Sequence, residues 1–210
     1  FTFYIGNFYA RGSSDLDPFF QFHPWLYLFL VPAIAMRLWA EERRSGTVEL
    51  LLTLPITPWQ AVLGKFLAAW LFIGLALLLT FPVWITVNYL GNPDNGVIVA
   101  GYIGSWLMAG GFLAIGSCMS ALTRNQVVAF ILSVVVCFGF LLSGLPMVMD
   151  LFSGWAPQAL LDAIAEFSFL AHFSTISRGV IDLRDLVYFA LVILFWLLAN
   201  TIVLELRKAD

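Results

Sequence analysis

Four long apolar segments constrain this chain most: residues 59–90, 97–122, 126–149 and 186–204. The centre of each segment lacks Asp, Glu, Lys, Arg and His. About 20 apolar residues are enough for a helix to cross a bilayer. Of the 210 residues, 61% are hydrophobic and only 11% are charged, whereas a soluble domain keeps about a quarter of its residues charged. The sequence therefore predicts an all-α integral membrane protein.

Two further membrane spans are expected near the N-terminus. Residues 25–40 form an apolar segment with Pro32 as a predicted kink. Residues 1–10 are apolar but too short to cross a bilayer, so we expect Phe1 to lie inside a first span. Together the segments predict one six-span helical bundle over residues 1–210.

The region before the last span has a different pattern. Within residues 157–173, Gln158, Asp162 and Glu166 fall on one helical face and apolar side chains fall mostly on the other. This pattern predicts an amphipathic helix at the external membrane surface. Asp182 then reads as the N-cap of the final span.

The densest charge in the chain lies in residues 41–58, which we call the elbow. Charged residues at 41–44 precede Gly46, and a short apolar run follows that ends at Leu54-Pro55. The run is too short to span, so a short helix is expected. Thr57 and Gln60 then predict a capping box at the start of the next span, and Asn125 predicts the N-cap of the span after the Arg124 turn. An ordinary cytoplasmic loop with an interfacial helix remains an alternative for the elbow.

The distribution of basic residues predicts the orientation. One side collects seven of the ten: Arg37, Arg43, Arg44, Lys65, Arg124, Arg207 and Lys208. The other side has Arg11, Arg178 and Arg184. By the positive-inside rule the first side is cytoplasmic, together with both termini.

The elbow also resembles a known signature. The run Glu41-Glu42-Arg43-Arg44-x-Gly46-Thr47-x-Glu49-Leu50-Leu51, followed by Leu54-Pro55 and Gly64-Lys65, resembles the cytoplasmic signature of type-2 ABC exporter permeases. It is most similar to the gliding-motility-associated branch of that class. The resemblance implies that the short helix is a coupling helix, which sits in a cleft of a cytoplasmic ATPase.

The resemblance further implies a set of site residues and partners. The implied ATPase-coupling residues are Glu41, Glu42, Arg43, Arg44, Gly46, Thr47, Glu49 and Leu50, with Arg124 as a secondary contact. A topology-fixing role is the alternative for Arg124. The implied partners are cytoplasmic ABC ATPase subunits, a second permease copy or a related permease, membrane lipids and periplasmic accessory subunits. The implied location is the bacterial inner membrane.

The sequence contains no pattern of residues that indicates catalysis. Gly64-Lys65 is followed by Phe66 and lacks the upstream glycine of a phosphate-binding loop. Cys118 and Cys137 lie in apolar runs. His23 and His172 each stand alone and are interpreted as interfacial residues. The predictions are no enzyme activity, no metal and no cofactor of its own, with ATP bound by a partner subunit. The net charge of −3 argues against a nucleic-acid partner.

Small residues in segment 97–122 favour close helix packing. Gly101, Ser105 and Ala109 recur at spacings of four, which allows helix backbones to approach closely in lipid. The general frequency of Gly and Ala in membrane spans is an equal alternative explanation.

Two functional hypotheses follow. The first is a transmembrane permease subunit of an ABC exporter, which couples a partner's ATP hydrolysis to substrate export or mechanical work. The second is a membrane scaffold or assembly subunit of an envelope machine, driven by an ATPase without a translocated substrate. A channel is disfavoured because no span shows a sustained polar stripe.

Overall fold

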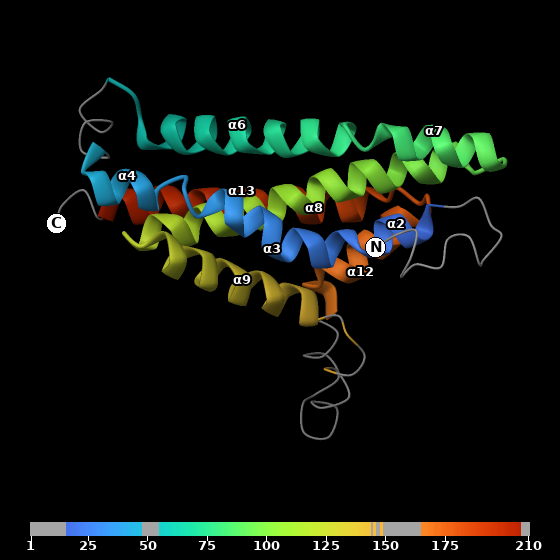
Figure 1. Cartoon of the computed structure of the whole chain (residues 1–210). Coiled ribbons are helices and arrows are strands. Elements are labelled where there is room, and N and C mark those ends of the chain that lie inside the picture. Colours follow the sequence, from blue (N-terminus) through green and yellow to red (C-terminus); the bar gives the residue numbers. More distant parts are fainter. Residues whose placement is uncertain (1–15, 48–54, 144, 146–147, 149–164, 207–210) are drawn as a thin grey trace, which may run out of the picture. The chain divides into compact units, whose positions relative to one another are not determined.

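The structure is a computed structural model that describes residues 16–47, 55–143, 145, 148 and 165–206. Every regular element among these residues is a helix, as the apolar segments predict (Figure 1). The helices are α2 (Asp17–Gln21), α3 (His23–Ala35), α4 (Ala40–Ser45), α6 (Pro58–Leu78), α7 (Phe81–Leu90), α8 (Asn95–Leu122), α9 (Gln126–Leu142), α12 (Phe169–Ser177) and α13 (Leu183–Leu206).

The chain divides into two compact units. Unit 1 comprises Phe1–Leu26, Gly74–Met108 and Gly139–Leu186, and unit 2 comprises Tyr27–Ile73, Ala109–Phe138 and Val187–Asp210. The longer helices α3, α6, α8, α9 and α13 each contribute residues to both units.

Unit 1 has an aromatic core around Phe20. The Phe20 ring packs edge-to-face on Tyr102 of α8, with centroids 5.5 Å apart. It also occupies the space beside Gly101, where an added Cβ would come within 2.6 Å of the ring. Gly104, one turn further along α8, contacts Ile176 of α12 in the same way. The glycines of α8 therefore admit larger side chains from α2 and α12.

His23 is buried at the start of α3 in unit 1, with 5% of its surface exposed. Its Nδ1 lies 2.9 Å from the carbonyl oxygen of Phe19, so the neutral ring donates its one proton there. Burial lowers the pKa of His23 to about 4. The side chain is thus a neutral cap, and its interfacial position stays a prediction.

Unit 2 is built around the second half of α8. Residues 109–115 have no exposed surface or almost none, and Ala109 is fully buried. The space beside Gly110 is filled by Trp70 of α6 and Ile193 of α13. Gly116 lies against Ala35 of α3, where an added Cβ would come within 2.5 Å of the alanine methyl group.

Three helix starts agree with the sequence prediction. In the Thr57–Gln60 capping box, Thr57 N donates to Gln60 Oε1 at 3.0 Å and Gln60 N donates to Thr57 Oγ1 at 3.4 Å. Asn125 Oδ1 accepts from Val127 N at 2.9 Å, and Asp182 Oδ1 accepts from Arg184 N at 3.2 Å. Each cap satisfies amide groups that a helix start leaves without an internal partner.

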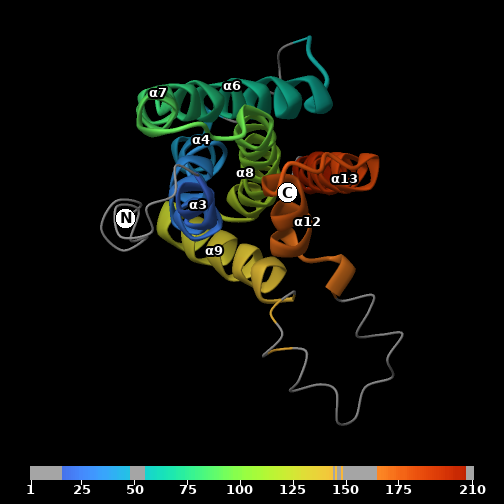
Figure 2. The same cartoon turned by 90° about the vertical axis from the view of Figure 1, so that its right-hand side faces the viewer.

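Three helical segments among the described residues are long and apolar enough to cross a membrane: Pro58–Leu90, Asn95–Leu122 and Leu183–Leu206. The first contains α6 and α7, which follow one another with a break at residues 79–80 and Pro82 in the first turn of α7 (Figures 1 and 2). α9 is apolar but shorter, and α3 has 13 residues with Pro32 inside it. The six-span count stays a prediction.

Two predicted boundaries differ from the structure. The helix expected over residues 25–40 ends at Ala35, and Met36–Trp39 form turns before α4 begins. The amphipathic helix expected over 157–173 is interrupted before Ser168, whose hydroxyl accepts from Ala171 N at 3.3 Å and caps α12. Residues 157–164 lie outside the described part of the chain.

Candidate functional site

The turn at Met36–Trp39, which we call the joint, delivers the chain from α3 to the elbow. One hydroxyl from α8 satisfies three backbone groups there. Ser120 Oγ accepts from Trp39 N at 3.1 Å and from Ala40 N at 3.0 Å, and it donates to Met36 O at 2.8 Å. Ser120 is fully buried, so water cannot replace these contacts. The helix breaks at the joint because a distant side chain supplies the hydrogen bonds that continuation would have made.

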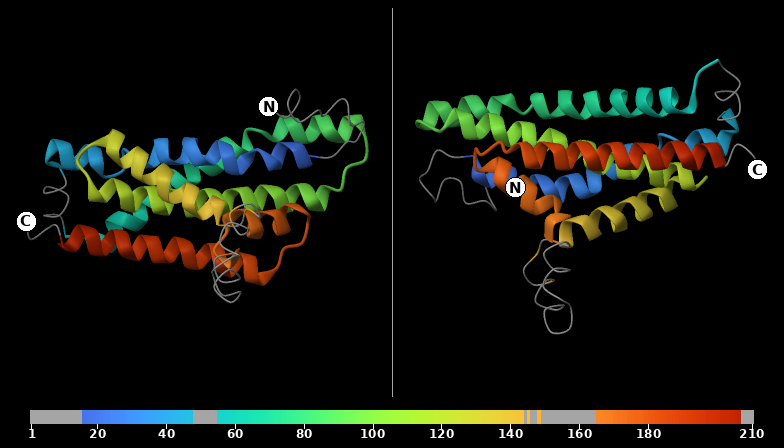
Figure 3. Two further views of the ribbon diagram at one scale, coloured as in Figure 1. Left: turned by 90° about the horizontal axis from the view of Figure 1, so that it is seen from below. Right: turned by 180° about the vertical axis from the view of Figure 1, so that it is seen from behind.

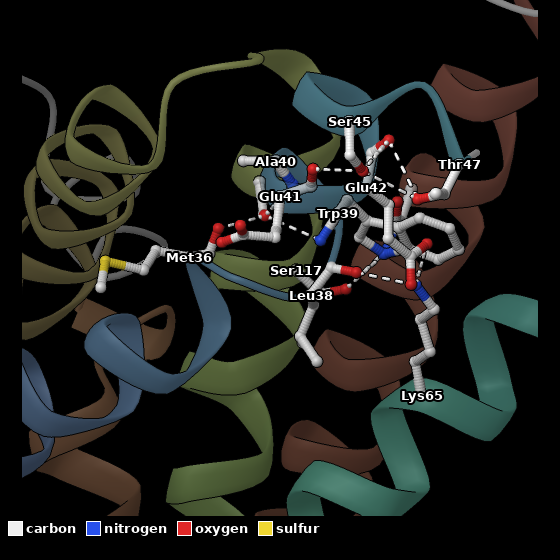
Figure 4. A network of polar contacts seen from close by, with 12 residues as sticks. Met36, Leu38, Trp39, Ala40, Glu41, Glu42, Ser45, Thr47, Lys65 and Ser117 are labelled. Atoms are coloured by element: carbon white, nitrogen blue, oxygen red, sulfur yellow. Dashed lines mark hydrogen bonds and ion pairs between the residues drawn. The ribbon is translucent and has the colours of Figure 1, made fainter.

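Trp39 anchors the joint to the bundle. Its side chain is 1% exposed, and the indole Nε1 donates to Ser117 Oγ at 3.1 Å. Asn200 of α13 donates to the same Ser117 hydroxyl at 2.8 Å. The joint, α8 and α13 therefore share one buried polar network (Figure 4).

Lys65 of α6 holds the joint from another side. Its amine donates to Leu38 O at 2.9 Å and lies over the Trp39 ring, 4.0 Å from the centroid. It also forms an ion pair with Glu42 of α4 (Figure 4). A lysine amine is attracted both by the face of an indole ring and by a carboxylate, and here the two lie together.

The charged residues of α4 make further contacts with the loop end of α8 and the start of α9. The Arg43 guanidinium donates to the carbonyl of Ala121, and Gln126 donates to the Glu41 carboxylate. Acidic residues lie in the first turn of α4 and basic residues in the last, which suits the helix dipole. Arg44 is exposed.

Gly46 ends α4 in the left-handed region, with a φ of +75°. A Cβ added there would meet no atom within 4 Å, so the backbone angle and not space favours glycine. Just before it, Ser45 Oγ lies 3.0 Å from Glu41 O and 2.9 Å from Thr47 Oγ1. The chain therefore leaves α4 by a defined turn toward the segment predicted to be the coupling helix.

The structure brings some predicted site residues together and leaves others apart. Glu41, Glu42, Arg43, Gly46 and Thr47 belong to the anchored α4 region. Glu49 and Leu50 lie outside the described residues. Arg124 is exposed in the turn between α8 and α9.

The residues of the predicted helix interface fall in separate surroundings. Gly101 faces Phe20 and Ser105 is fully buried, both in unit 1. Ala109 is buried in unit 2.

Sequence reasoning missed the partners that hold the elbow. Ser117, Ser120, Trp39 and Asn200 are uncharged, and no contact with the elbow was predicted for them. One signal was present: Ser117 and Ser120 are three residues apart on one face of an otherwise apolar segment. Hydroxyls repeated in this way inside a membrane helix need partners from neighbouring helices.

The arrangement joins α4 to its neighbours by hydrogen bonds and an ion pair. Among the described residues, no three His, Cys, Asp or Glu side chains gather as a metal site. The two cysteines, Cys118 and Cys137, are buried and free. What the site offers is a short charged helix fixed by α6, α8, α9 and α13.

Comparison with known proteins gives one family. The model of a family described as ABC-2 family transporter protein matches residues 26–204. No curated protein matches the chain.

Proposed function

Because this chain belongs to the ABC-2 family of transporter proteins, we propose that it is the transmembrane permease subunit of an ABC exporter whose elbow receives movement from a partner ATPase. The family match and the apolar helices indicate a multi-pass membrane protein. In this proposal ATP is bound and hydrolysed by the partner, and the permease converts the movement into substrate export or mechanical work.

The anchoring of α4 is the observation that carries the coupling role. Helix α4 follows the joint, which Ser120 and Trp39 fix to α8, and it is paired to α6 through Glu42 and Lys65. Packed helices and buried hydrogen bonds transmit displacement because they have few alternative arrangements. A displacement of the segment after Gly46 would therefore be transmitted through α4 directly to α6 and α8.

The number of described basic residues near the elbow in sequence supports the proposed orientation. The described basic residues of unit 2 are Arg37, Arg43, Arg44, Lys65 and Arg124. Those of unit 1 are Arg178 and Arg184. The positive-inside rule then puts the elbow in the cytoplasm, where an ATPase is available, at the bacterial inner membrane.

The finer features of the proposal rest on the elbow signature. The run from Glu41 to Leu51 supports membership in the gliding-motility-associated branch and the export direction. Six spans, cytoplasmic termini, a dimer with a second copy or a related permease, and periplasmic accessory subunits complete the proposed assembly. Glu49, Leu50 and Arg124 are the proposed direct contacts to the ATPase, together with Glu41, Glu42, Arg43, Arg44, Gly46 and Thr47.

The proposal is tested by reconstitution. The full-length protein is placed in lipid nanodiscs with each ATPase encoded beside it, and ATP hydrolysis is measured with and without the permease. We expect co-purification of one ATPase and stimulation of its hydrolysis. Reversing Glu49 to Lys should reduce the stimulation while membrane insertion is unchanged.

Arg178→Gln is the matched control, since Arg178 is charged and exposed and is not among the proposed coupling residues. It should leave the stimulation unchanged. Failure of every ATPase to bind would overturn the permease proposal.

A further inference from the structure

Asn200 of α13 is a polar side chain in unit 2 with no exposed surface. Its Nδ2 donates to Ser117 Oγ of α8 at 2.8 Å, and the same hydroxyl accepts from the indole Nε1 of Trp39 at 3.1 Å. Asn200 Oδ1 is buried as well, and it has no hydrogen-bond partner among the described residues. The amide therefore makes one contact and leaves its acceptor atom unsatisfied.

Turning the amide over would not remove this defect. Oδ1 would then accept the proton of Ser117 Oγ, and the NH₂ group would be buried with both of its hydrogens unused. A buried polar atom without a partner is rare in native structures and unfavourable. A single hydrogen bond between membrane helices stabilises them little, because the unfolded chain in the membrane also finds partners. The amide is thus a poor choice for stability at this position.

Leucine is the apolar side chain that matches asparagine in the number and branching of its heavy atoms. It would bury no polar atom, and Ser117 would still accept from Trp39. The other hydroxyl of the network differs in this respect, because Ser120 satisfies three backbone groups of the joint. Stability therefore explains Ser120 but does not explain Asn200.

What the amide does supply is a link from α13 to the joint. A single atom, Ser117 Oγ, stands between the Asn200 amide and the indole of Trp39, which is 1% exposed. α13 is one unbroken helix from Leu183 to Leu206 (red in Figure 3). A hydrogen bond has a preferred distance and direction, whereas apolar contacts are non-directional. An amide at position 200 therefore fixes α13 to Ser117 more strictly than leucine would.

We propose that Asn200 is a positioning residue, which carries a displacement of the joint to α13, and that it serves this role rather than the stability of the fold. The inference rests on the proposed coupling function, in which the elbow receives movement from the ATPase. The elbow follows the joint, so this movement would reach Trp39, then Ser117, and then α13 through Asn200.

The first test measures this link without an ATPase. Trp39→Phe removes the indole N–H from Ser117 but keeps an aromatic ring for the Lys65 amine. Amide hydrogen exchange of residues 197–204 is followed by mass spectrometry on the full-length protein in nanodiscs. We expect Trp39→Phe to raise this exchange about threefold in the wild-type background and to leave it unchanged in the Asn200→Leu background. Equal changes in both backgrounds, or none in either, would overturn the inference.

The second test separates coupling from stability. Asn200→Leu should unfold at the same temperature as the wild type or at a higher one, and it should bind the ATPase as before. Its stimulation of ATP hydrolysis should fall about fivefold. Asn200→Ala, which cannot overpack the site, should lose the stimulation equally. A lower unfolding temperature in Asn200→Leu, or full stimulation in both variants, would contradict the positioning role.

Ser105→Ala is the matched control. Ser105 of α8 is also fully buried, and its Oγ likewise has no partner among the described residues, but it lies in unit 1. The change removes the same kind of unsatisfied atom, and stimulation should persist. Its loss there would assign the effect to any buried polar atom and overturn the inference. If the wild type itself binds no ATPase, the proposed function fails, and the exchange experiment still decides whether Asn200 links the joint to α13.

Discussion

The amine of Lys65 lies over the indole of Trp39, with Nζ 4.0 Å from the ring centroid, while it also pairs with Glu42. One cation from α6 therefore holds both the last residue of the joint and the first turn of α4. Lys65 and Glu42 are only 21% and 31% exposed at their side chains, so solvent screens the pair incompletely.

The Lys65 contact is tested by a double-mutant cycle of Lys65→Met and Glu42→Gln. Methionine keeps most of the apolar stem and removes the charge. We expect a coupling energy of about 1 kcal/mol in the free energy of unfolding, because the carboxylate loses its one described cation. Unfolding in mixed micelles measures it. Additive effects of the two changes would show that the pair contributes nothing.

Ser120→Ala removes only one hydroxyl group, but it should lower the free energy of unfolding considerably. The change leaves Trp39 N, Ala40 N and Met36 O without their partner, and each unsatisfied buried group costs about 1–3 kcal/mol. Some relaxation of the turn is expected, so we predict a loss of roughly 2–4 kcal/mol in the free energy of unfolding.

Ser133→Ala is the matched control for Ser120. Ser133 is equally buried in unit 2, but its hydroxyl donates only to Ala129 O within its own helix. Its removal leaves no group unsatisfied, since that carbonyl keeps its helical partner. Equal losses from both serines would contradict the special role of Ser120.

Gly46→Ala tests the exit from α4. Alanine at a φ of +75° costs about 1 kcal/mol, although there is room for the methyl group. We expect lower thermal stability and weaker ATPase stimulation, because α4 loses its defined end. Gly64→Ala, in the interior of α6 with no atom within 4 Å of the added Cβ, should instead be neutral or slightly stabilising.

Gly101→Ala tests the close approach in unit 1. The added methyl group would meet the Phe20 ring at 2.6 Å, and such overpacking costs about 1–3 kcal/mol. Combining it with Phe20→Leu should restore part of the loss, whereas Gly139→Ala, with open space around it, should cost little. Thermal unfolding of the four variants decides whether Phe20 is the obstacle.

The buried neutral ring of His23 predicts that the free energy of unfolding decreases at acidic pH. Its pKa is about 4 in the folded protein against an ordinary value of 6.5, so the unfolded chain binds the proton more readily. The neutral ring's contribution is complete above about pH 6.5 and is lost as pH falls toward 4, by up to about 3 kcal/mol. His23→Gln should flatten the stability profile over that range. An unchanged profile would mean that other groups cause the acid sensitivity.

Local signals were predictable from the sequence, because their partners lie within a few residues. Thr57 and Gln60 cap α6, and Asn125 caps α9, as their spacing predicts. The helical class follows from the apolar segments. The end of α3 was not predictable in this way, since it depends on Ser120, which lies 81 residues from Trp39 in the sequence. Tertiary contact overrode a continuous helical pattern there.

The candidate site, too, was predictable only where its features are local in the sequence. The charged run from Glu41 to Arg44 marked the elbow, and Gly46 ends α4 there in the left-handed region. The polar residues that hold it are spread over α6, α8 and α13, so no local pattern connects them to the elbow. His172 was likewise read as solitary because its partner Asp185 belongs to the next helix.

The hydroxyl of Ser120 has one hydrogen and two lone pairs, and the joint uses all three. A turn of α8 by a single residue, about 100°, would carry this hydroxyl away and break every one of the contacts together. All three contacts of the joint therefore depend on one oxygen atom, and the loss of that atom removes them together.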